Sequence, residues 1–600
     1  MKLTRIHIEN FRNFWKLDIK LNGDVVIVGE NRVGKSNLLH ALRLIFDPSL
    51  PESARQLDQG DFHDGLGEPL EDEKIVIFIE LRDFEDDPDL LAQLTDFRLD
   101  DDEKTVRLSY EFRPLPNLED FPESDDDYEF LCYGGESENK RFGHELRRRI
   151  SLDLLPALRD AEGDLALWRK SPLRPLLERA FAAVSNDDLN EVRSAVTAAT
   201  NKLAEFPSVQ DLEQQLKTQF ALMSGPKQDI ELSFGFGTTE VRRLFRNLRL
   251  LIDGGLRTIG DASLGSANVA FLTLKALELQ QMMAENKRDH ALLAIEEPEA
   301  HLHPHLQRSV YRHLFEGLAA GQGGARPVSL LLTTHSPHIA SVAPLRSLVL
   351  LRNAGNDGTV ATSAANIDLT TDEVDDLARY LDVTRAEMLF ARGILLVEGD
   401  AEKFLMPVFA KSMGHDLDHL GITICSVSGT NFTPYAKFLT AMDIPFAVVT
   451  DWDYRETGKA LGWNRALKLV ETMESTRQNK HVQRLIEELD AIEDPNDFSA
   501  KCETYGVFTN VYTLEIDLFN DKRFVKALAE TLREKPCSLA RKTQVDGWEK
   551  DPTTLDAAAY LNSIEAIGKG RFAQRLATRI AGVKPPAYIQ DAIAFVVDRV

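Results

Sequence analysis

The stretch Gly29-Glu-Asn-Arg-Val-Gly-Lys-Ser36 matches in full the glycine-rich pattern of a phosphate-binding loop. An apolar run over residues 24–29 predicts a buried strand before it, and apolar residues at helical spacing predict a helix over residues 35–46 after it. In this setting backbone N–H groups surround phosphates at a helix amino terminus, Lys35 adds a positive charge and Ser36 can ligate Mg²⁺. The stretch therefore predicts a nucleotide site in an α/β domain.

Such a site needs carboxylates at the end of a neighbouring buried strand, and Leu292-Leu-Ala-Ile-Glu-Glu-Pro-Glu299 provides them. We expect Glu296 to hold Mg²⁺ through water and Glu297 to polarise the attacking water as a general base. The alternative interpretation is two surface glutamates after a core strand, because adjacent acids after apolar residues are common in isolation.

Four stretches together with this loop carry a family resemblance. They are Ile8-Glu-Asn-Phe-Arg-Asn-Phe14, Ser263-Leu-Gly-Ser-Ala-Asn268, Glu296-Glu-Pro-Glu-Ala-His-Leu-His-Pro304 and Thr334-His-Ser-Pro337. The set resembles the ABC-type ATPases of the RecF and SMC group over about residues 1–365, excluding the helical segment at residues 164–225. The resemblance implies two heads that sandwich ATP, with Ser263 and Gly265 of one subunit completing the site of the other and His335 sensing the γ-phosphate. The nucleotide contacts that it implies are Arg12, Asn31, Gly34, Lys35, Ser36, Ser263, Gly265, Glu296 and His335.

The first domain is interrupted by a helical segment. Apolar periodicity predicts helices over residues 187–203 and 209–223, strand character returns at residues 230–236, and a helix-like stretch over residues 371–389 leads to a second unit. We expect the segment to be a dimerisation arm, with a packed structural insertion as the alternative. The expected divisions are residues 1–163 and 226–370 for the two parts of the ATPase, 164–225 for the insertion, and 371–600 for the second domain with helical and basic elements at its carboxyl end.

A second group of acids follows two short buried runs in this last part. The stretches are Val397-Glu-Gly-Asp-Ala-Glu402 and Val449-Thr-Asp-Trp-Asp453. Glu398 and Glu402 lie one helical turn apart, and Asp451 and Asp453 are expected on one side of an extended strand end. Clustered carboxylates repel one another unless a cation neutralises them, and oxygen-only ligands favour Mg²⁺ or Mn²⁺ over zinc. The alternative is solvated acids at two strand ends.

This second pattern resembles a Toprim domain, the metal-binding fold shared by topoisomerases, primases and certain nucleases. An ABC-type ATPase followed by Toprim resembles the OLD (overcoming lysogenization defect) family of nucleases, which includes the nuclease subunit of the Gabija phage-defence system. Two further stretches, Tyr512-Thr-Leu-Glu-Ile-Asp517 and Gly568-Lys-Gly-Arg-Phe-Ala573, are similar to the family's additional acidic motif and its catalytic lysine. The resemblance covers the whole chain.

The resemblance also implies roles for these residues. One metal would be held by Glu398, Asp451 and Asp453. Glu402 and Glu515 would help to form a second metal site, and Lys569 would stabilise the charged transition state. Two metals can activate the water and stabilise the leaving oxygen of a phosphodiester. For Glu515 and Lys569 the alternatives are a surface acid at a strand end and a loop lysine.

Candidate DNA contacts are basic runs without any sequence-specific readout. Arg571, Arg575 and Arg579 recur at four-residue spacing and predict one basic helical stripe that can grip backbone phosphates. Other candidates are Arg147, Arg148, Arg149, Arg242, Arg243, Arg246 and Arg249. Most such runs are solvated faces.

Composition narrows the class of protein. At 600 residues, 43% hydrophobic and 28% charged, the chain should fold as several globular domains. Its net charge of −26 repels phosphate, so any contact with nucleic acid must come from local basic patches or metal ions. Four scattered cysteines give no zinc cluster, and neither a signal peptide nor a membrane span is visible. We expect a cytoplasmic protein with no membrane contact.

These features predict an ATP-binding, metal-dependent DNA endonuclease that is regulated by its ATPase and acts in phage defence or DNA processing. A homodimer or higher homo-oligomer is expected, and a helicase-like partner protein is compatible with the resemblance. The rival hypothesis is a RecF/SMC-like repair ATPase that binds DNA without cleaving it. A topoisomerase or primase is disfavoured, because the sequence has neither a separate domain carrying a nucleophilic tyrosine nor a zinc ribbon.

Overall fold

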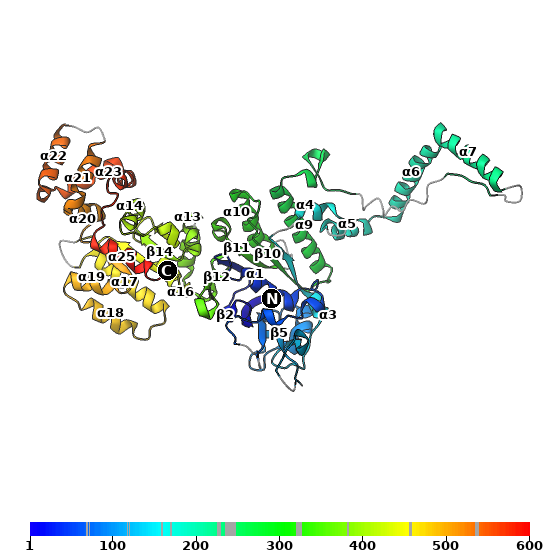
Figure 1. Ribbon diagram of the computed structural model, residues 1–600, viewed down its shortest axis with the longest axis horizontal. Coiled ribbons are helices and arrows are strands. Elements are labelled where there is room, and N and C mark those ends of the chain that lie inside the picture. Colours follow the sequence, from blue (N-terminus) through cyan, green and yellow to red (C-terminus); the bar gives the residue numbers. More distant parts are fainter. Residues whose placement is uncertain are drawn as a thin grey trace.

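The computed structural model of the protein describes residues 1–67, 70, 73–116, 118, 121–157, 160–168, 171–224, 230–234, 248–319, 327–380, 383–454, 459–534 and 539–600. Three sheets of four or more strands and one two-stranded ribbon organise these ranges (Figure 1). The chain is α/β, with an ATPase region built on the first two sheets and a second α/β unit after it. The predicted fold class is confirmed.

The first sheet is antiparallel, with the order β2-β1-β4-β5-β6. Its strands are β1 (Lys2–Phe11), β2 (Phe14–Lys20), β4 (Ile75–Arg82), β5 (Val106–Pro114) and β6 (Tyr128–Gly134). Alternate residues of β4 are buried, so one face of the sheet packs on the core while the other carries charged side chains. This sheet covers the nucleotide-binding sheet on one side.

The second sheet has the order β13-β12-β3-β11-β10-β7 and is parallel apart from β13. Its strands are β3 (Val25–Gly29), β7 (Ile150–Leu155), β10 (His290–Glu296), β11 (Ser329–Thr334), β12 (Leu348–Asn353) and β13 (Thr359–Ser363). Every residue of β3 and β11 is buried, as expected for central parallel strands. The carboxyl ends of β3, β11 and β10 therefore meet at one edge, where ligands bind in such sheets.

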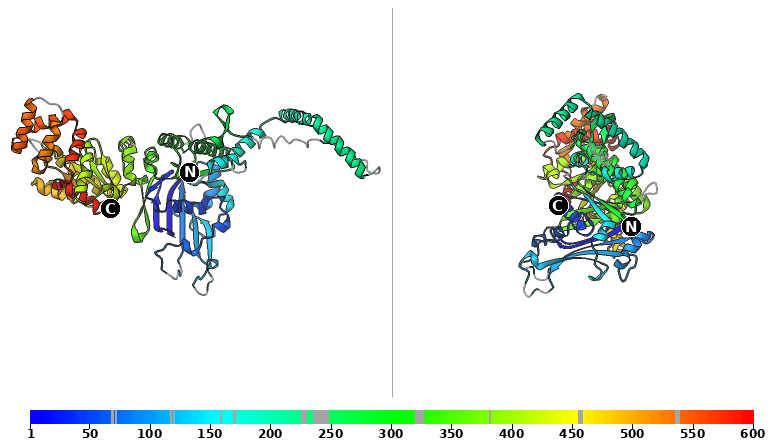
Figure 2. Two further views of the ribbon diagram at one scale, coloured as in Figure 1. Left: turned by 45° about the horizontal axis from the view of Figure 1, so that its top comes forward. Right: turned by 90° about the vertical axis from the view of Figure 1, so that its right-hand side faces the viewer.

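A helical arm leaves the ATPase region and extends away from the body of the molecule (Figure 2). Helices α4 (Ala161–Ala166) and α5 (Leu173–Ala182) pack against α9 (Leu264–Ala284) at its base, and α6 (Asn186–Ala204) and α7 (Pro207–Ser224) form the part that extends away. None of the residues of α5, α6 or α7 is buried. The predicted strand at residues 230–236 is wrong for 230–234, which pair with no other strand; the remainder lies outside the described residues.

The described part of the ATPase region also contains the helices α1 (Lys35–Phe46), α2 (Pro88–Leu94), α3 (His144–Arg149), α9 (Leu264–Ala284), α10 (Pro304–His313) and α11 (Pro337–Ala340). The short strands β8 (Leu251–Ile252) and β9 (Arg257–Thr258) form its two-stranded ribbon. Helix α1 has the bounds that the apolar periodicity predicts.

The third sheet is parallel, with the order β15-β14-β16-β17. Its strands are β14 (Gly393–Val397), β15 (Ile422–Ser426), β16 (Phe446–Thr450) and β17 (Val507–Thr509). The helices around it are α14 (Asp400–Ser412), α15 (Leu417–Leu420), α16 (Thr433–Ala441), α17 (Leu461–Thr476), α18 (Val482–Asp490), α19 (Pro495–Glu503) and α25 (Ala587–Val597). A helical layer beyond the sheet contains α20 (Leu514–Asn520), α21 (Lys522–Arg533), α22 (Leu539–Lys550), α23 (Ala557–Ile567) and α24 (Lys569–Arg579).

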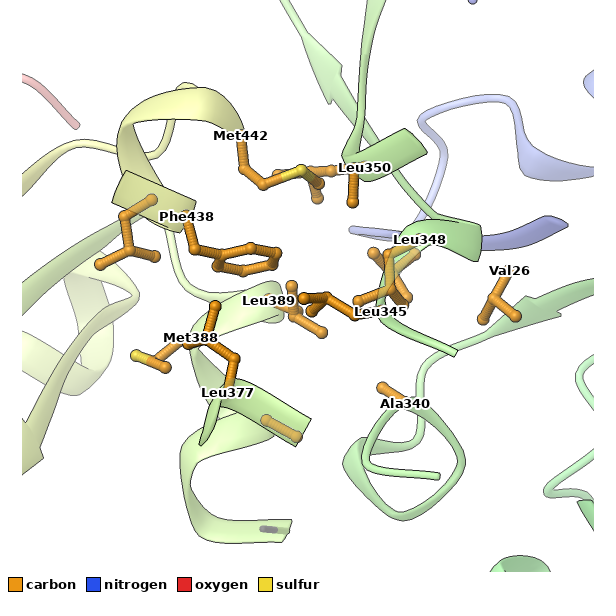
Figure 3. Packing of buried hydrophobic residues seen from close by; sticks show 14 of the residues in the cluster. Val26, Ala340, Leu345, Leu348, Leu350, Leu377, Met388, Leu389, Phe438 and Met442 are labelled. Carbon is orange, nitrogen blue, oxygen red and sulfur yellow. The ribbon is translucent and has the colours of Figure 1, made fainter. Parts of the chain in front are cut away.

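The two α/β units share one continuous hydrophobic core (Figure 3). The predicted helix over residues 371–389 is instead α12 (Thr371–Tyr380), α13 (Val383–Ala386) and a 3₁₀ turn at Glu387–Phe390. The 3₁₀ turn carries Met388 and Leu389 into this core, between the ATPase sheet and α16. The described residues of the junction are therefore packed and form no extended linker between the units.

No helix within the described ranges combines the length and the apolar character needed to cross a membrane.

Candidate nucleotide and metal sites

The phosphate-binding loop has a backbone that requires glycine at two positions. Gly34 has φ 88°, and a Cβ there would lie 2.0 Å from Nδ2 of Asn13. Gly29 has φ 154°, and a Cβ there would lie 2.5 Å from the carbonyl oxygen of Leu351. The loop is thus held tightly between β1, β12 and the start of α1, with Asn31 and Ser36 exposed on its outer side.

Lys35 lies inside this loop. Its Nζ donates hydrogen bonds to the carbonyl oxygens of Gly29 at 2.9 Å and Glu30 at 2.7 Å. Burial lowers the pKa of Lys35 to about 8, although the carboxylates of Glu297 and Glu299 act in the opposite direction. The ammonium group is therefore held at the centre of the loop by weak acceptors that phosphate oxygens can replace.

The predicted acids lie at the ends of neighbouring strands. Glu296 ends β10 in register with Thr333 of β11, and Glu297 follows with φ 41°. Nε2 of His335 lies 3.8 Å from Oε1 of Glu297, and burial together with the charge of Lys35 lowers the pKa of this histidine. The sheet thus brings Lys35, Glu296, Glu297 and His335 to one edge.

Glu299 is a partner that the sequence analysis did not assign. Its carboxylate accepts hydrogen bonds from the backbone N–H of His335 at 2.6 Å and from Oγ1 of Thr334 at 2.8 Å. It fixes the turn that presents His335. The sequence signal that could have identified Glu299 is its place as the third acid of the stretch Glu296-Glu-Pro-Glu299.

Arg12 extends the site toward a side cavity. Its guanidinium donates to Asp61 at 2.7 Å and to Asn37 at 2.9 Å, beside the loop. The cavity measures about 640 Å³, and Arg12, Trp15 and His63 are among its lining residues. This volume and these planar side chains suit a nucleoside next to the phosphates.

Ser263 and Gly265 lie apart from these residues, at the amino terminus of α9. Ser263 caps the helix by accepting from the N–H of Ser266, and a Cβ at Gly265 would lie 2.6 Å from the carbonyl oxygen of His301. In the described part of the chain, no contact joins either residue to Lys35 or Ser36.

Acids of the third sheet gather at the carboxyl ends of β14 and β16. Oε1 of Glu398 accepts from Oγ1 of Thr450 at 2.5 Å and from the backbone N–H of Asp451 at 2.9 Å. Asp451 in turn accepts a hydrogen bond from the side chain of Asn510, which follows β17. Three strand ends therefore position these two acids.

Glu402 and Glu515 face the same group from α14 and α20. Burial, reinforced by neighbouring carboxylates, raises the pKa of Glu402 to about 7 and that of Asp451 to about 8. Nζ of Lys569 lies 3.8 Å from Oε1 of Glu515. Burial opposes the charge of Lys569, but Glu515, Asp451 and Glu402 outweigh it and raise its pKa. The structure thus brings Glu402, Asp451 and Glu515 close to one lysine, with Glu398 hydrogen-bonded to the backbone of Asp451.

The backbone of Asp453 does not continue the extended conformation of β16, and its side chain pairs with an arginine. Its φ is 50°, so the expected extended strand end does not reach it, and its Oδ2 accepts from Nη2 of Arg465 at 2.7 Å. Arg465 also donates to Glu398. Neither Arg465 nor Asn510 was predicted, because nothing in the spacing of α17 or of the three-residue strand β17 marks them.

The donor set fits a hard divalent ion. It contains only carboxylate oxygens, and burial together with the neighbouring carboxylates raises the pKa of Asp451 and of Glu402, so a bound divalent ion would favour their charged forms. Glu398, Glu402, Asp451 and Asp453 each accept a hydrogen bond from the protein, as when Glu402 accepts from the N–H of Gly399. Within the described ranges, no group of three His, Cys, Asp or Glu side chains is already arranged to hold a metal ion.

Four of the ten predicted DNA-binding arginines form ion pairs within the protein. Arg575 and Arg579 pair with Glu534 across α24 and α21, so the expected free stripe is wrong beyond the exposed Arg571. The other candidates differ in their surroundings. Arg147 is buried and paired with Glu52, Arg149 is paired with Asp289, Arg148 is exposed, and Arg242, Arg243 and Arg246 lie outside the described residues.

Comparisons with known proteins match a family model to each of the two α/β units. Residues 25–341 match the family model "AAA domain, putative AbiEii toxin, Type IV TA system", and residues 389–453 match "Overcoming lysogenization defect protein-like, TOPRIM domain". The chain is 24% identical to Endonuclease GajA of Bacillus cereus over 579 residues, which cover 89% of this chain and 91% of that protein. It is 25% identical to the OLD nuclease of Thermus scotoductus, over 75% of this chain and 82% of that protein.

Among solved structures, the C-terminal region of the Burkholderia pseudomallei OLD protein is 39% identical, with 35% of this chain and 98% of that one covered and a TM-score of 0.30. The two matched domains imply the use of ATP and of a divalent ion. The chain therefore belongs to the OLD family, in which an AAA, ABC-like ATPase region is followed by a Toprim nuclease domain.

Proposed function

We propose that this protein is a metal-dependent DNA endonuclease whose hydrolytic site lies at the carboxyl ends of β14 and β16. The observation that carries the proposal is the group of Glu402, Asp451 and Glu515, which are buried or nearly so at one end of the sheet and have Lys569 as the cation beside them among the described residues. Burying several carboxylates close together costs stability, and a bound divalent ion would offset that cost.

Divalent ions bound by these acids would supply the activated water and stabilise the leaving oxygen of a phosphodiester. Glu398, Asp451 and Asp453 are the proposed ligands of one ion, and Glu402 and Glu515 contribute to a second. The ammonium group of Lys569 stands where it can stabilise the negative charge that develops on the phosphate. Hydrolysis by nicking or cleavage of DNA follows from this assignment.

The ATPase region is proposed to bind ATP at Lys35 and Ser36 and to regulate the nuclease, with Glu296 holding Mg²⁺ and Glu297 as general base. Arg12, Asn31, Gly34 and His335 are the further proposed contacts within the chain. Ser263 and Gly265 would complete the site of a second copy. A role in phage defence or DNA processing, and a helicase-like partner, are proposals by similarity to the relatives.

Asp451→Asn tests the proposal. The variant keeps the acceptor for Asn510 but removes the charge, so we expect nicking of supercoiled plasmid in Mn²⁺ to fall at least a hundredfold. The matched control is Asp443→Asn, at the exposed opposite end of β16, which should nick like the native protein. Nicking that survives in Asp451→Asn, or DNA binding without strand breaks in the native protein, would favour the repair-ATPase alternative.

A further inference from the structure

Arg465 places a fixed positive charge among the proposed metal ligands. Its Nη1 lies 3.0 Å from Oε1 of Glu398, and its Nη2 lies 2.7 Å from Oδ2 of Asp453. Nη1 also donates to Oγ1 of Thr450 at 2.5 Å and to the carbonyl oxygen of Asp451 at 3.0 Å. One guanidinium group therefore joins two carboxylates to the end of β16.

The local fold holds this side chain in place. A Cβ at Gly462 would lie 2.6 Å from the carbonyl oxygen of Asp451, so glycine allows the first turn of α17 to approach the strand end closely. The N–H of Gly462 donates to the carbonyl oxygen of Trp452 at 2.8 Å. The side chain of Arg465 is only 14% exposed, which strengthens its interactions with the two carboxylates relative to a surface pair.

The acids thus fall into two groups. Glu398 and Asp453 pair with Arg465, and Glu515 lies 3.8 Å from Nζ of Lys569, whereas no ion pair within the described residues holds Glu402 or Asp451. Resting on the proposed function, we propose that Arg465 is the resident counter-ion of Glu398 and Asp453 and competes with the divalent ion for these two ligands. Arg465 is then a positioning residue that sets the concentration of divalent ion at which the site loads.

The direction of the effect distinguishes this role from a structural one. Removing a positive charge about 3 Å from two ligands makes the site more negative and frees both carboxylates, so a doubly charged ion should bind more tightly. If Arg465 served only to hold the fold together, its loss would weaken metal binding.

The test is calorimetric titration of Mn²⁺ into the nucleotide-free full chain. We expect Arg465→Gln to bind Mn²⁺ about tenfold more tightly than the native protein, and Arg465→Lys, which keeps the charge, to stay within about threefold of it. Arg477→Gln is the matched control, because Arg477 pairs with Glu474 at the far end of α17. Unchanged or weaker binding by a folded Arg465→Gln would overturn the proposal.

A second measurement uses the native protein, so it does not depend on the variant folding. Phenylglyoxal labelling followed by peptide mass spectrometry should show that Arg465 reacts faster when Mn²⁺ is present, with Arg477 as the internal reference. Equal reactivity with and without Mn²⁺ would contradict the competition.

Plasmid nicking separates this proposal from the proposed function. In Arg465→Gln, half-maximal nicking should need about tenfold less Mn²⁺ than in the native protein. If no protein nicks DNA while the calorimetric shift is present, the nuclease assignment fails and the role of Arg465 stands.

Discussion

Among the acids of the proposed metal site, Asp451 has a pKa that its surroundings raise strongly. It is held by Asn510 at the end of β17, and burial with the charges of Glu398 and Glu402 raises its pKa to about 8. A carboxyl group whose pKa is higher in the folded protein than in the unfolded chain makes folding less favourable as pH rises. For Asp451 this loss begins near its ordinary pKa of about 4 and is complete above about 8.

Asp451→Asn should therefore stabilise the metal-free protein by an amount that depends on pH. In EDTA, we expect the melting temperature of the variant to exceed that of the native protein increasingly from pH 5 to pH 8.5, by about 2 °C or more at the upper end. Differential scanning calorimetry measures the difference, with Asp443→Asn as control. An advantage that is the same at pH 5 and pH 8.5 would show that the charge of Asp451 is not the cause.

At the scale of elements, the sequence predicted those strands and helices that have strong local signals. Helix α1 and strands β10, β14 and β16 were found because continuous apolar runs or helical periodicity end at glycine or at acids. Strand β17 was not predicted, because three residues are too few to show a periodic pattern. Asn510 directly follows this strand, so its position at the site was not predicted either. The pairing of Arg575 and Arg579 with Glu534 depends on how α24 packs against α21, which no local pattern reports.

The site residues also divide into those with a local sequence signal and those whose position depends on packing. Side chains placed by strand ends, such as Lys35, Glu296, Glu398 and Asp451, could be predicted because parallel strands bring their carboxyl ends to one edge. Arg465 could not be predicted, because its side chain reaches these acids from α17 (Leu461–Thr476), a helix that follows the acids in the sequence.

The arm formed by α6 and α7 yields a prediction about assembly. Apolar side chains on α7 are exposed, among them Leu212 at 52% and Leu216 at 43%, one helical turn apart. We propose that a second copy covers them, so Leu212→Glu with Leu216→Glu should shift the mass measured by light scattering from oligomer to monomer. Gln214→Glu with Thr218→Glu, on the opposite face of α7, is the control. An unchanged mass in the leucine variant would assign the arm another role.

At the scale of the whole molecule, the units that carry the proposed nucleotide site and the proposed nuclease site share one hydrophobic core. Nη2 of Arg352 on β12 donates to the carbonyl oxygen of Met442 in the Toprim unit at 2.8 Å, and Glu30 of the phosphate-binding loop pairs with Arg392 at 2.6 Å, just before β14. Strand β14 then leads to Glu398. We propose that a change in the conformation of the loop on binding ATP alters these contacts and, through β14, the position of Glu398. This is the physical basis that we propose for regulation of the nuclease by ATP.

The central claim is that one chain carries a nucleotide site and a separate nuclease site. The most direct measurement compares binding of a fluorescent ATP analogue with plasmid nicking in Mn²⁺, on the same preparations of the native protein, Lys35→Ala and Glu398→Ala. We predict that Glu398→Ala binds the analogue normally but does not nick, and that Lys35→Ala loses at least tenfold in nucleotide affinity and nicks without responding to ATP. Native nicking by Glu398→Ala would contradict the account.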